Sequence, residues 1–324
     1  MLLNPGPRIV YPPGADTDMR SAFGAALTDI FLRNRGIHPV VFDCDLRDSL
    51  KLGAIARDCP ECLIECGIAE QNAVTVAAAA AKAGLPAFFA DFGVFAIAEV
   101  YSQLRMADIN RAPLKLFATH CGLDVGEDGK THQCLDYLSL LRNLRHMEIL
   151  VPADPNQADA MTRYAAAGES AVCVCMGRSK TPVLTDANGE LLTFTGPENG
   201  FWLRRGTDAV VVTMGGMAAR ALQTSEHVGV YAVTRPGVFD DADMAEVMRS
   251  TIVVTYEDHF IKNGLGSIVG LYLLEHGYRG RFSRLGAKSY GVSASPEELY
   301  RREGLDADSL IEYVKLMIAK GKCT

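Results

Sequence analysis

Short apolar runs alternate with longer stretches of helical periodicity along most of the chain, starting at Asp18. The apolar runs predict buried strands, and the stretches between them have the residue spacing of helices. Strands are expected over 39–46, 86–92, 115–120, 147–154 and 171–177, and helices over 19–34, 71–84, 96–110 and 156–168. Strands that alternate with helices in this way imply an α/β fold with a mostly parallel, doubly wound sheet.

A turn-rich stretch, 185–200, interrupts this series, and a second α/β series follows it. Its expected elements are strands over 208–216, 228–236, 250–259 and 282–287, with a helix over 264–277. We therefore predict two doubly wound domains behind a Pro- and Gly-rich arm: 1–17 as the arm, 18–190 as the first domain and 191–324 as the second. The chain of 324 residues is long enough for two domains of ordinary size.

The charge balance argues against a nucleic-acid surface. There are 32 basic and 39 acidic residues, a formal net charge of −7, and the acids are spread along the chain. The most apolar stretch, 74–90, is broken by Lys82 and by Gly84 with Pro86, so no membrane span is expected. The first residues lack the pattern of a signal peptide, which predicts a reducing, cytoplasmic location.

Nine cysteines raise the question of a metal site. Cys59 and Cys62 have the C-x-x-C spacing of a zinc-binding pair, with Cys66 nearby. A structural zinc site requires a second pair at similar spacing, and the remaining cysteines do not supply one. The expectation is that the cysteines are structural or incidental thiols.

The segment THCGLDVGEDGKTHQ, residues 119–133, combines two histidines, three acids and three glycines. Such a mixture buries surface poorly and presents polar groups on a tight loop. It follows the apolar run 113–118 and precedes a helix-like stretch that begins near Cys134. A polar loop at the end of a buried strand is where open α/β sheets keep their sites. The segment is therefore a candidate functional site.

Four separated motifs resemble the transketolase family, in the order found there, and the resemblance covers most of residues 18–310. They are the loop 119–133, the helix start ECGIAEQN (65–72), the turn DFGVF (91–95) and the pair EDH (257–259) with GLG (264–266). The resemblance implies a pyrimidine-binding domain that binds thiamine diphosphate, followed by a transketolase C-terminal domain. His259 would lie at the domain interface.

Four residues match cofactor-binding positions of that family. Glu70 matches the carboxylate that bonds the cofactor's aminopyrimidine ring and thereby activates the cofactor, which requires a desolvated carboxyl. Phe92 and Phe95 match rings that pack on the pyrimidine, although aromatic residues in such a run can equally be core. Asp45 matches an acid near the cofactor, and a turn or capping role remains open for it.

Five residues match substrate-binding positions. His120 and His132 would bond the sugar's hydroxyls or phosphate, and Asp128 would bond a hydroxyl next to the carbonyl. Arg178 and Arg20 match two arginines that hold the acceptor's phosphate. A solvated arginine at a helix start is an equally simple interpretation of Arg20.

Two departures from the family pattern stand out. Ala98 occupies a position where transketolases often have Tyr, and Lys130 replaces a Pro or small residue. These changes leave room for an unusual sugar, branched or carrying another anion.

The motif GDG…N, which holds the metal and the cofactor's diphosphate in this family, has no counterpart here. The resemblance therefore implies the C-terminal subunit of a split transketolase, active with a separate N-terminal subunit that holds Mg²⁺ (or Ca²⁺ or Mn²⁺). The expected assembly is an α2β2 heterotetramer, with thiamine diphosphate between the subunits.

The expected reaction is transfer of a two-carbon ketol unit from a ketose, such as a sugar phosphate, to an aldose. Three alternatives remain: the β subunit of a 2-oxo-acid dehydrogenase, a deoxyxylulose-phosphate-synthase-like enzyme, and a non-catalytic assembly subunit. Retention of Glu70, His120, Asp128 and His132 counts against the last.

Overall fold

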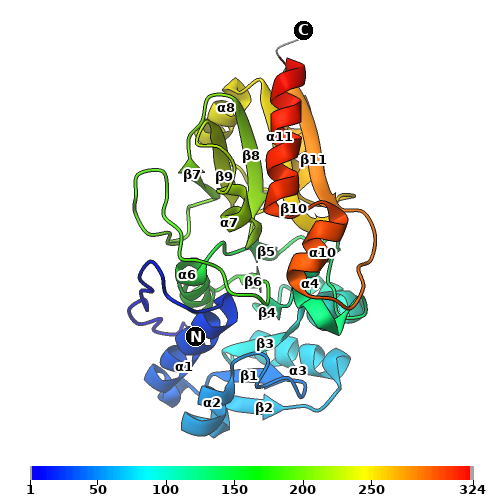
Figure 1. Ribbon diagram of the computed structural model, residues 1–324. Coiled ribbons are helices and arrows are strands. Elements are labelled where there is room, and N and C mark those ends of the chain that lie inside the picture. The colour runs from blue at the N-terminus through cyan, green and yellow to red at the C-terminus, as the bar shows by residue number, and fades with distance from the viewer. Residues whose placement is uncertain (1, 322–324) are drawn as a thin grey trace.

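The computed structural model describes residues 2–321 and contains two β-sheets, one after the other along the chain (Figure 1). All strand pairs of the first sheet are parallel, and its order is β2-β1-β3-β4-β6-β5. Its strands are β1 (Val40–Asp43), β2 (Leu63–Glu65), β3 (Ala87–Phe92), β4 (Lys115–Thr119), β5 (Met147–Leu150) and β6 (Ala171–Cys175). The expected parallel sheet is confirmed.

Helices cover both faces of this sheet. Those of the first unit are α1 (Met19–Arg33), α2 (Gly53–Asp58), α3 (Glu70–Lys82), α4 (Tyr101–Ile109), α5 (Tyr137–Leu141) and α6 (Pro155–Ala167), with short turns η1 (Arg35–Ile37), η2 (Pro60–Cys62), η3 (Val94–Glu99) and η4 (Leu123–Asp128). Alternate strand residues belong to two core clusters: Phe88 packs with α1, and Phe89 packs with α3. This division is that of a doubly wound sheet.

The second sheet has the order β11-β10-β8-β9-β7. Its strands are β7 (Gly200–Arg204), β8 (Ala209–Met214), β9 (Val228–Val233), β10 (Ile252–Phe260) and β11 (Arg281–Ala287), and its helices are α7 (Met217–Ala221), α8 (Asp241–Arg249), α9 (Leu265–Glu275), α10 (Pro296–Glu303) and α11 (Ala307–Gly321). The edge strand β7 is antiparallel to β9. Neither β7 nor the helices α7, α8, α10 and α11 were expected from the sequence.

Several predicted elements end earlier than expected, for local reasons. The strand predicted to reach Asp154 ends at Leu150, because the Asp154 carboxylate accepts the Gln157 N–H at 2.8 Å and caps α6. The strand predicted to reach residue 46 ends at Asp43, and Asp45 has a left-handed φ of 63°. The helix predicted over 96–110 is divided into the π-helical turn η3 and the helix α4.

The predicted arm lies against the first unit without forming a helix or strand over residues 2–17. The Asn34 side chain bonds both the N–H and the carbonyl of Asn4, and the Ile9 N–H donates to Asp159 at 3.1 Å. These contacts hold the arm beside α1 and α6. Within the described residues, no helix combines the length and apolar character that crossing a membrane requires.

The two units share one core cluster, which extends from α3 through β4 and β6 to β8 and β10. The loop after β4 also packs on the second unit: η4 lies against α10, and the Phe260 N–H donates to the Leu135 carbonyl at 2.7 Å. His259 is fully buried, and its ring packs edge-on against Tyr137 at 5.2 Å. The second unit therefore supports the loop predicted to be functional.

Candidate active site

The loop 119–133 begins with a histidine in an unusual backbone conformation. β4 ends at Thr119, and His120 follows with a φ of 57°, which is uncommon for a residue with a side chain. The Thr119 hydroxyl and His120 Nδ1 are hydrogen-bonded at 2.8 Å, and the His120 ring stacks on Phe92 at 3.6 Å between centroids. The left-handed turn thus directs the imidazole across the end of β3, where Phe92 lies.

Cations surround the other edge of this imidazole. Arg20 Nη1 lies 3.4 Å from His120 Nε2. Burial lowers the pKa of His120 to about 2, and the charges of Arg20 and Arg178 contribute to the shift. The ring is therefore neutral at physiological pH. It can donate or accept a hydrogen bond but cannot act as a cationic acid.

Phe92, Phe95 and His132 continue the aromatic group. Phe92 comes from the end of β3 and Phe95 from η3, and their rings stack at 6.1 Å. The half-buried His132, from the far end of the loop, meets Phe95 edge-on at 5.4 Å and Phe92 at 6.3 Å. Three segments that are separate in sequence therefore build one aromatic cluster.

Arg178 connects the loop to the end of β6. Its Nη1 donates to the Val125 carbonyl at 2.6 Å and lies 3.4 Å from Glu127 and 4.0 Å from Asp128. Asp128 is exposed, as is Lys130 two residues further on. Arg20 is anchored separately, with Nη1 donating to the Ser49 carbonyl at 3.1 Å and Nε 3.5 Å from Asp18. Both arginines flank the aromatic cluster.

Glu70 is the first residue of α3, at the same end of the sheet, and is 7% exposed. Asp91, the residue before Phe92, is fully buried close to it. Burial, together with the charge of Glu70, raises the pKa of Asp91 to about 8. Asp91 was not predicted as a site residue. The available signal was a charged residue inside the otherwise apolar run AFFADF.

Asp45 lies on the outer rim of this region. It is exposed, and its N–H donates to Glu65 at 3.0 Å. The same carboxylate accepts the Gly67 N–H at 2.8 Å, so Glu65 ties the β1 loop to the segment that leads into Glu70. The backbone therefore turns at Asp45, and the Asp45 carboxylate is exposed to solvent.

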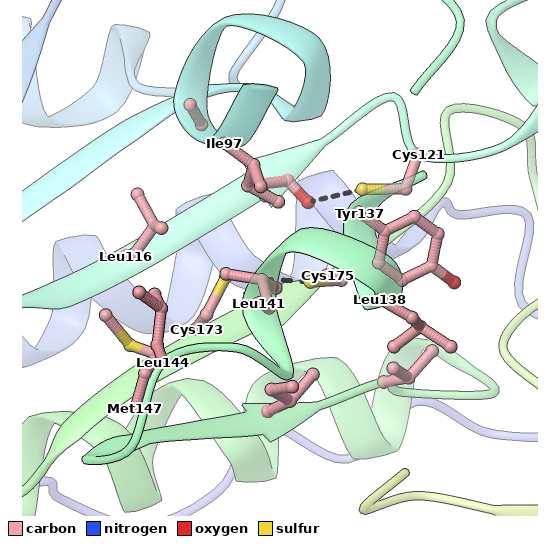
Figure 2. Close-up of a cluster of buried hydrophobic side chains, with 14 of the residues drawn as sticks. Ile97, Leu116, Cys121, Tyr137, Leu138, Leu141, Leu144, Met147, Cys173 and Cys175 are labelled. Carbon is pink, nitrogen blue, oxygen red and sulfur yellow. Dashed lines mark hydrogen bonds between the residues drawn. The ribbon is translucent and has the colours of Figure 1, made fainter. Parts of the chain in front are cut away.

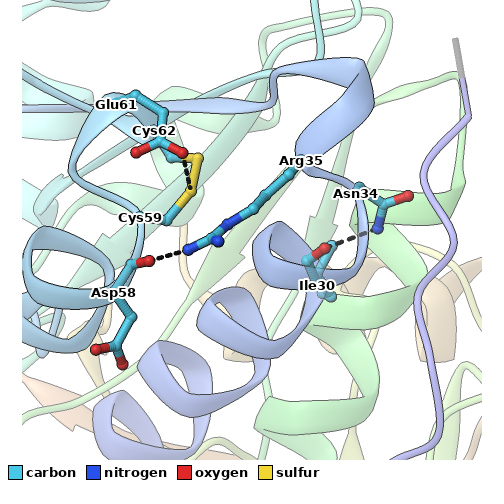
Figure 3. The surroundings of a disulfide bond; sticks show 7 residues. All are labelled: Ile30, Asn34, Arg35, Asp58, Cys59, Glu61 and Cys62. Atoms are coloured by element: carbon cyan, nitrogen blue, oxygen red, sulfur yellow. Dashed lines mark hydrogen bonds between the residues drawn. A yellow bond between two sulfur atoms is a disulfide. The ribbon is translucent and has the colours of Figure 1, made fainter.

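A disulfide joins Cys59 and Cys62 in the turn η2 that leads into the edge strand β2 (Figure 3). Structural or incidental thiols were expected here, and the structure differs because η2 brings the two Cα atoms to 5.5 Å, a normal disulfide separation. Glu61 lies beside the pair, and its carboxylate is 3.3 Å from the Cys59 sulfur. The bridge holds the end of α2 against the start of β2.

Four other cysteines lie in the core beneath the loop: Cys121, Cys134, Cys173 and Cys175. Figure 2 shows three of them among Tyr137, Leu141 and neighbouring side chains. Burial contributes to raising the pKa of each thiol, together with thiol–thiol hydrogen bonds in the case of Cys134. Such thiols are unreactive, so this group is packing beneath the loop.

Gly122 allows the loop to pack closely against the second unit. Its φ is 88° and its ψ is −164°, a conformation that is essentially restricted to glycine. A Cβ at this position would lie 2.0 Å from Asp258 Oδ2. Asp258 itself is half-buried, and the Tyr300 hydroxyl donates to it at 3.2 Å. The loop and the second unit are therefore in direct contact at Gly122.

Two family models match the chain. The model described as transketolase, pyrimidine binding domain, matches residues 15–183, and the transketolase C-terminal domain matches residues 200–310. The first match covers more than half of the chain.

Full-length comparisons agree with these matches. A Methanocaldococcus jannaschii protein named for a transketolase C-terminal section is 29% identical over 93% of this chain and 96% of its own length. The rat transketolase is 26% identical, and a 1-deoxy-D-xylulose-5-phosphate synthase of Chlorobium phaeovibrioides is 30% identical. The chain spans only about half the length of these two, 51% and 49%.

A solved structure of a split-gene transketolase, an inactive β4 tetramer, superposes with a TM-score of 0.80 at 30% identity. The superposition covers 94% of this chain and 99% of that one. The architecture of two sheets, the loop after β4 and the family matches all agree. This chain belongs to the transketolase family, of which it carries the pyrimidine-binding and C-terminal domains.

Proposed function

We propose that this chain is the C-terminal subunit of a thiamine-diphosphate-dependent transketolase that transfers a two-carbon ketol unit from a ketose, such as a sugar phosphate, to an aldose. The observation that carries the proposal is the aromatic cluster of Phe92, Phe95, His120 and His132, flanked by Arg20 and Arg178. Aromatic rings next to two guanidinium groups suit a flat cofactor ring and an anionic sugar. Its expected location is the cytoplasm.

The residues fit one half of the cofactor. Glu70 provides a buried carboxyl, and Phe92 and Phe95 provide flat apolar faces, as an aminopyrimidine ring requires. When bound, thiamine diphosphate supplies the nucleophilic carbon that takes up the two-carbon unit. Glu70 would hold a proton at the pyrimidine ring.

The residues do not fit the metal and diphosphate half. In the described part of the chain, the one close group of three metal-ligand side chains is Cys59, Glu61 and Cys62. Mg²⁺, Ca²⁺ and Mn²⁺ prefer oxygen ligands, whereas two of these three side chains are sulfurs that are joined in the disulfide. We therefore assign the metal and the diphosphate to a separate N-terminal subunit.

Exposed apolar residues beside Glu70 support a covering partner. Ile68 is 83% exposed and Ile64 is 36% exposed, immediately before a carboxyl that is 7% exposed. A partner that covers these isoleucines would also exclude water from the Glu70 pocket. We propose an α2β2 assembly in which each site is shared between unlike subunits.

On this proposal, each substrate-facing residue has a separate task. Neutral His120 would bond a hydroxyl of the sugar, and His132, at the far end of the loop, would bond another. Arg20 and Arg178 would hold the phosphate, while the exposed Asp128 would contact the donor. The exposed Lys130 and the half-buried Ala98 leave room for a branched or additionally anionic sugar.

A second candidate is deoxyxylulose-phosphate-synthase-type chemistry, which the 30% identity to the Chlorobium phaeovibrioides enzyme favours. That reaction consumes a 2-oxo acid instead of a ketose donor. The β subunit of a 2-oxo-acid dehydrogenase would also consume a 2-oxo acid. An assay that compares ketose donors with 2-oxo-acid donors distinguishes both of these alternatives from ketol transfer.

The test is to co-express the chain with a neighbouring gene product that carries GDG…N, and to assay the pair with thiamine diphosphate and Mg²⁺. The expected result is ketol transfer from ketose phosphates. Glu70→Ala should reduce turnover at least about a hundredfold without changing the melting temperature, while Glu312→Gln on α11 should change neither. Decarboxylation of a 2-oxo acid without ketol transfer, or full activity of Glu70→Ala, would refute the proposal.

A further inference from the structure

A cavity lies at the amino end of the second sheet. It has a volume of about 610 Å³ and is formed by the segments 248–252 and 277–281. The first segment joins α8 to β10, and the second joins α9 to β11. Three arginines, Arg249, Arg279 and Arg281, line the cavity. None of the described residues that line it is acidic.

This cavity is separate from the candidate active site. β10 runs from Ile252, at the cavity, to Phe260, whose N–H donates to the Leu135 carbonyl just beyond the loop 119–133. The eight steps along this strand span about 26 Å, at about 3.3 Å for each residue. Figure 1 shows α8 at the end of the second unit that faces away from the first unit. An anion held in the cavity would therefore differ from the substrate anion of the candidate active site.

Two of the three guanidinium groups have no protein partner. Within residues 2–321, the side chains of Arg249 and Arg279 make no hydrogen bond and no ion pair. Glu246, the acid of α8 that is nearest in sequence to the cavity, is paired with Arg205 instead. Two positive charges are therefore left without a carboxylate in the described part of the chain, although the formal net charge of the whole chain is −7.

Hydrogen bonds hold the two segments of the cavity together. The Tyr278 hydroxyl donates to the Ser250 carbonyl at 2.9 Å, and the Arg281 N–H donates to the Thr251 carbonyl at 2.8 Å. A Cβ on Gly280 would lie 2.2 Å from the Tyr278 hydroxyl oxygen, so the backbone passes close to that side chain. The backbone that carries the arginines is thus ordered before a ligand binds, which lowers the entropic cost of binding.

Helix ends explain only one of the three arginines. Arg249 is the last residue of α8, where the partial negative charge of the helix C-terminus attracts a cation. This attraction falls off within one turn, and Arg279 lies four residues beyond Glu275, the last residue of α9. Arg281 lies in a strand, and sheets have only small net dipoles. The grouping of all three around one cavity is explained by an anionic ligand.

We propose that this cavity binds an oligophosphate group, the group shared by inorganic pyrophosphate and by nucleoside di- and triphosphates. Each guanidinium fork can bond two phosphate oxygens, and three forks suit an anion that carries several charges on adjacent phosphates. The volume of about 610 Å³ lies within the range of small-molecule sites, about 300–1,000 Å³. The exposed Thr251 hydroxyl lines the same cavity and can donate a further hydrogen bond.

Isothermal titration calorimetry of the chain with pyrophosphate, in magnesium-free buffer, tests the proposal. Orthophosphate should bind at least about tenfold more weakly than pyrophosphate, because it offers fewer oxygens and less charge. Arg249→Gln and Arg279→Gln should each weaken pyrophosphate binding at least about fivefold, and the double variant at least about twentyfold. Both side chains are exposed, so the melting temperatures should stay unchanged.

Arg105→Gln/Arg145→Gln is the control for net charge. Both arginines are exposed and belong to the first unit, and the double substitution removes the same two positive charges. The affinity for pyrophosphate should stay within about twofold of the wild-type value, because distant exposed charges are screened. A loss as large as that of Arg249→Gln/Arg279→Gln would show that binding follows net charge, and the proposal would fail.

Thr251 allows a test that keeps all three arginines. Thr251→Glu places a carboxylate at the cavity and should weaken pyrophosphate binding at least about tenfold by repulsion. Thr251→Gln adds a side chain of nearly the same size without the charge, and its affinity should stay within about threefold of the wild-type value. Equal affinities of the two variants would contradict the proposal.

A comparison of pyrophosphate with ATP distinguishes the sources of the oligophosphate group. Equal affinities would show that the cavity recognises the phosphates alone, whereas tighter binding of ATP would show that the nucleoside is also recognised. Either result supports the proposal if Arg249→Gln/Arg279→Gln weakens the binding. The absence of saturable binding of both ligands, binding that this double variant leaves unchanged, or orthophosphate binding as tight as that of pyrophosphate would overturn it.

Discussion

Replacing Gly122 with Ala should destabilise the contact between the substrate loop and the second unit. The backbone at Gly122, with φ 88° and ψ −164°, costs a residue with a side chain about 1–3 kcal/mol. The new Cβ would also lie 2.0 Å from Asp258 Oδ2 in a buried contact, and overpacking of this kind costs about 1–3 kcal/mol more. The expected loss of unfolding free energy is therefore about 2–6 kcal/mol.

Gly67→Ala measures a backbone contribution alone. Gly67 also has a positive φ, 65°, but a Cβ there would meet nothing within 4 Å. This variant should lose only the backbone contribution, about 1–2 kcal/mol. A larger loss in Gly122→Ala than in Gly67→Ala therefore combines the more restricted backbone of Gly122 with the Asp258 contact, and the double-mutant cycle with Asp258 isolates the steric contribution.

Urea unfolding measures these losses. The single tryptophan, Trp202 in β7, reports on the second sheet, and circular dichroism reports on the whole chain. A double-mutant cycle with Asp258→Ala should recover about 1–3 kcal/mol of the Gly122→Ala loss, because Asp258→Ala removes the atoms that the Cβ would strike. Equal losses in Gly122→Ala and Gly67→Ala, together with a coupling energy of zero, would refute the steric argument.

Two further predictions concern buried groups. Burial raises the pKa of Asp258 to about 7, so between pH 4 and 7 the folded chain holds a proton that the unfolded chain releases. The free energy of unfolding should therefore fall as the pH rises from about 4 to 7, by at most about 4 kcal/mol relative to Asp258→Asn. Urea unfolding at pH 5 and pH 8 checks this, and parallel curves for the two proteins would contradict it. Reducing the Cys59–Cys62 bridge, which closes a loop of three-residue separation, should cost about 2 kcal/mol. Thiol titration with and without reductant shows whether the bridge is formed, and urea unfolding of the Cys59→Ser/Cys62→Ser variant measures the loss of stability. An unchanged free energy of unfolding would contradict the prediction.

The alternation of apolar runs and helical stretches predicted every strand of the first sheet except the three-residue edge strand β2. Buried parallel strands are continuous apolar runs, and this signal does not depend on distant residues. The second unit was predicted less completely. β7 is a half-buried edge strand, and α10 is a short polar helix, so neither has a strong local pattern.

The chain's own sequence thus determined which residues are candidates for the site: the polar loop 119–133, the acidic Glu70 and the aromatic Phe92 and Phe95. Only the tertiary structure decided which of them meet. The stacking of His120 on Phe92 and the position of Arg20 beside His120 depend on strand register and on packing between distant segments. A local sequence pattern cannot predict these contacts, because they form between residues that are up to 100 positions apart.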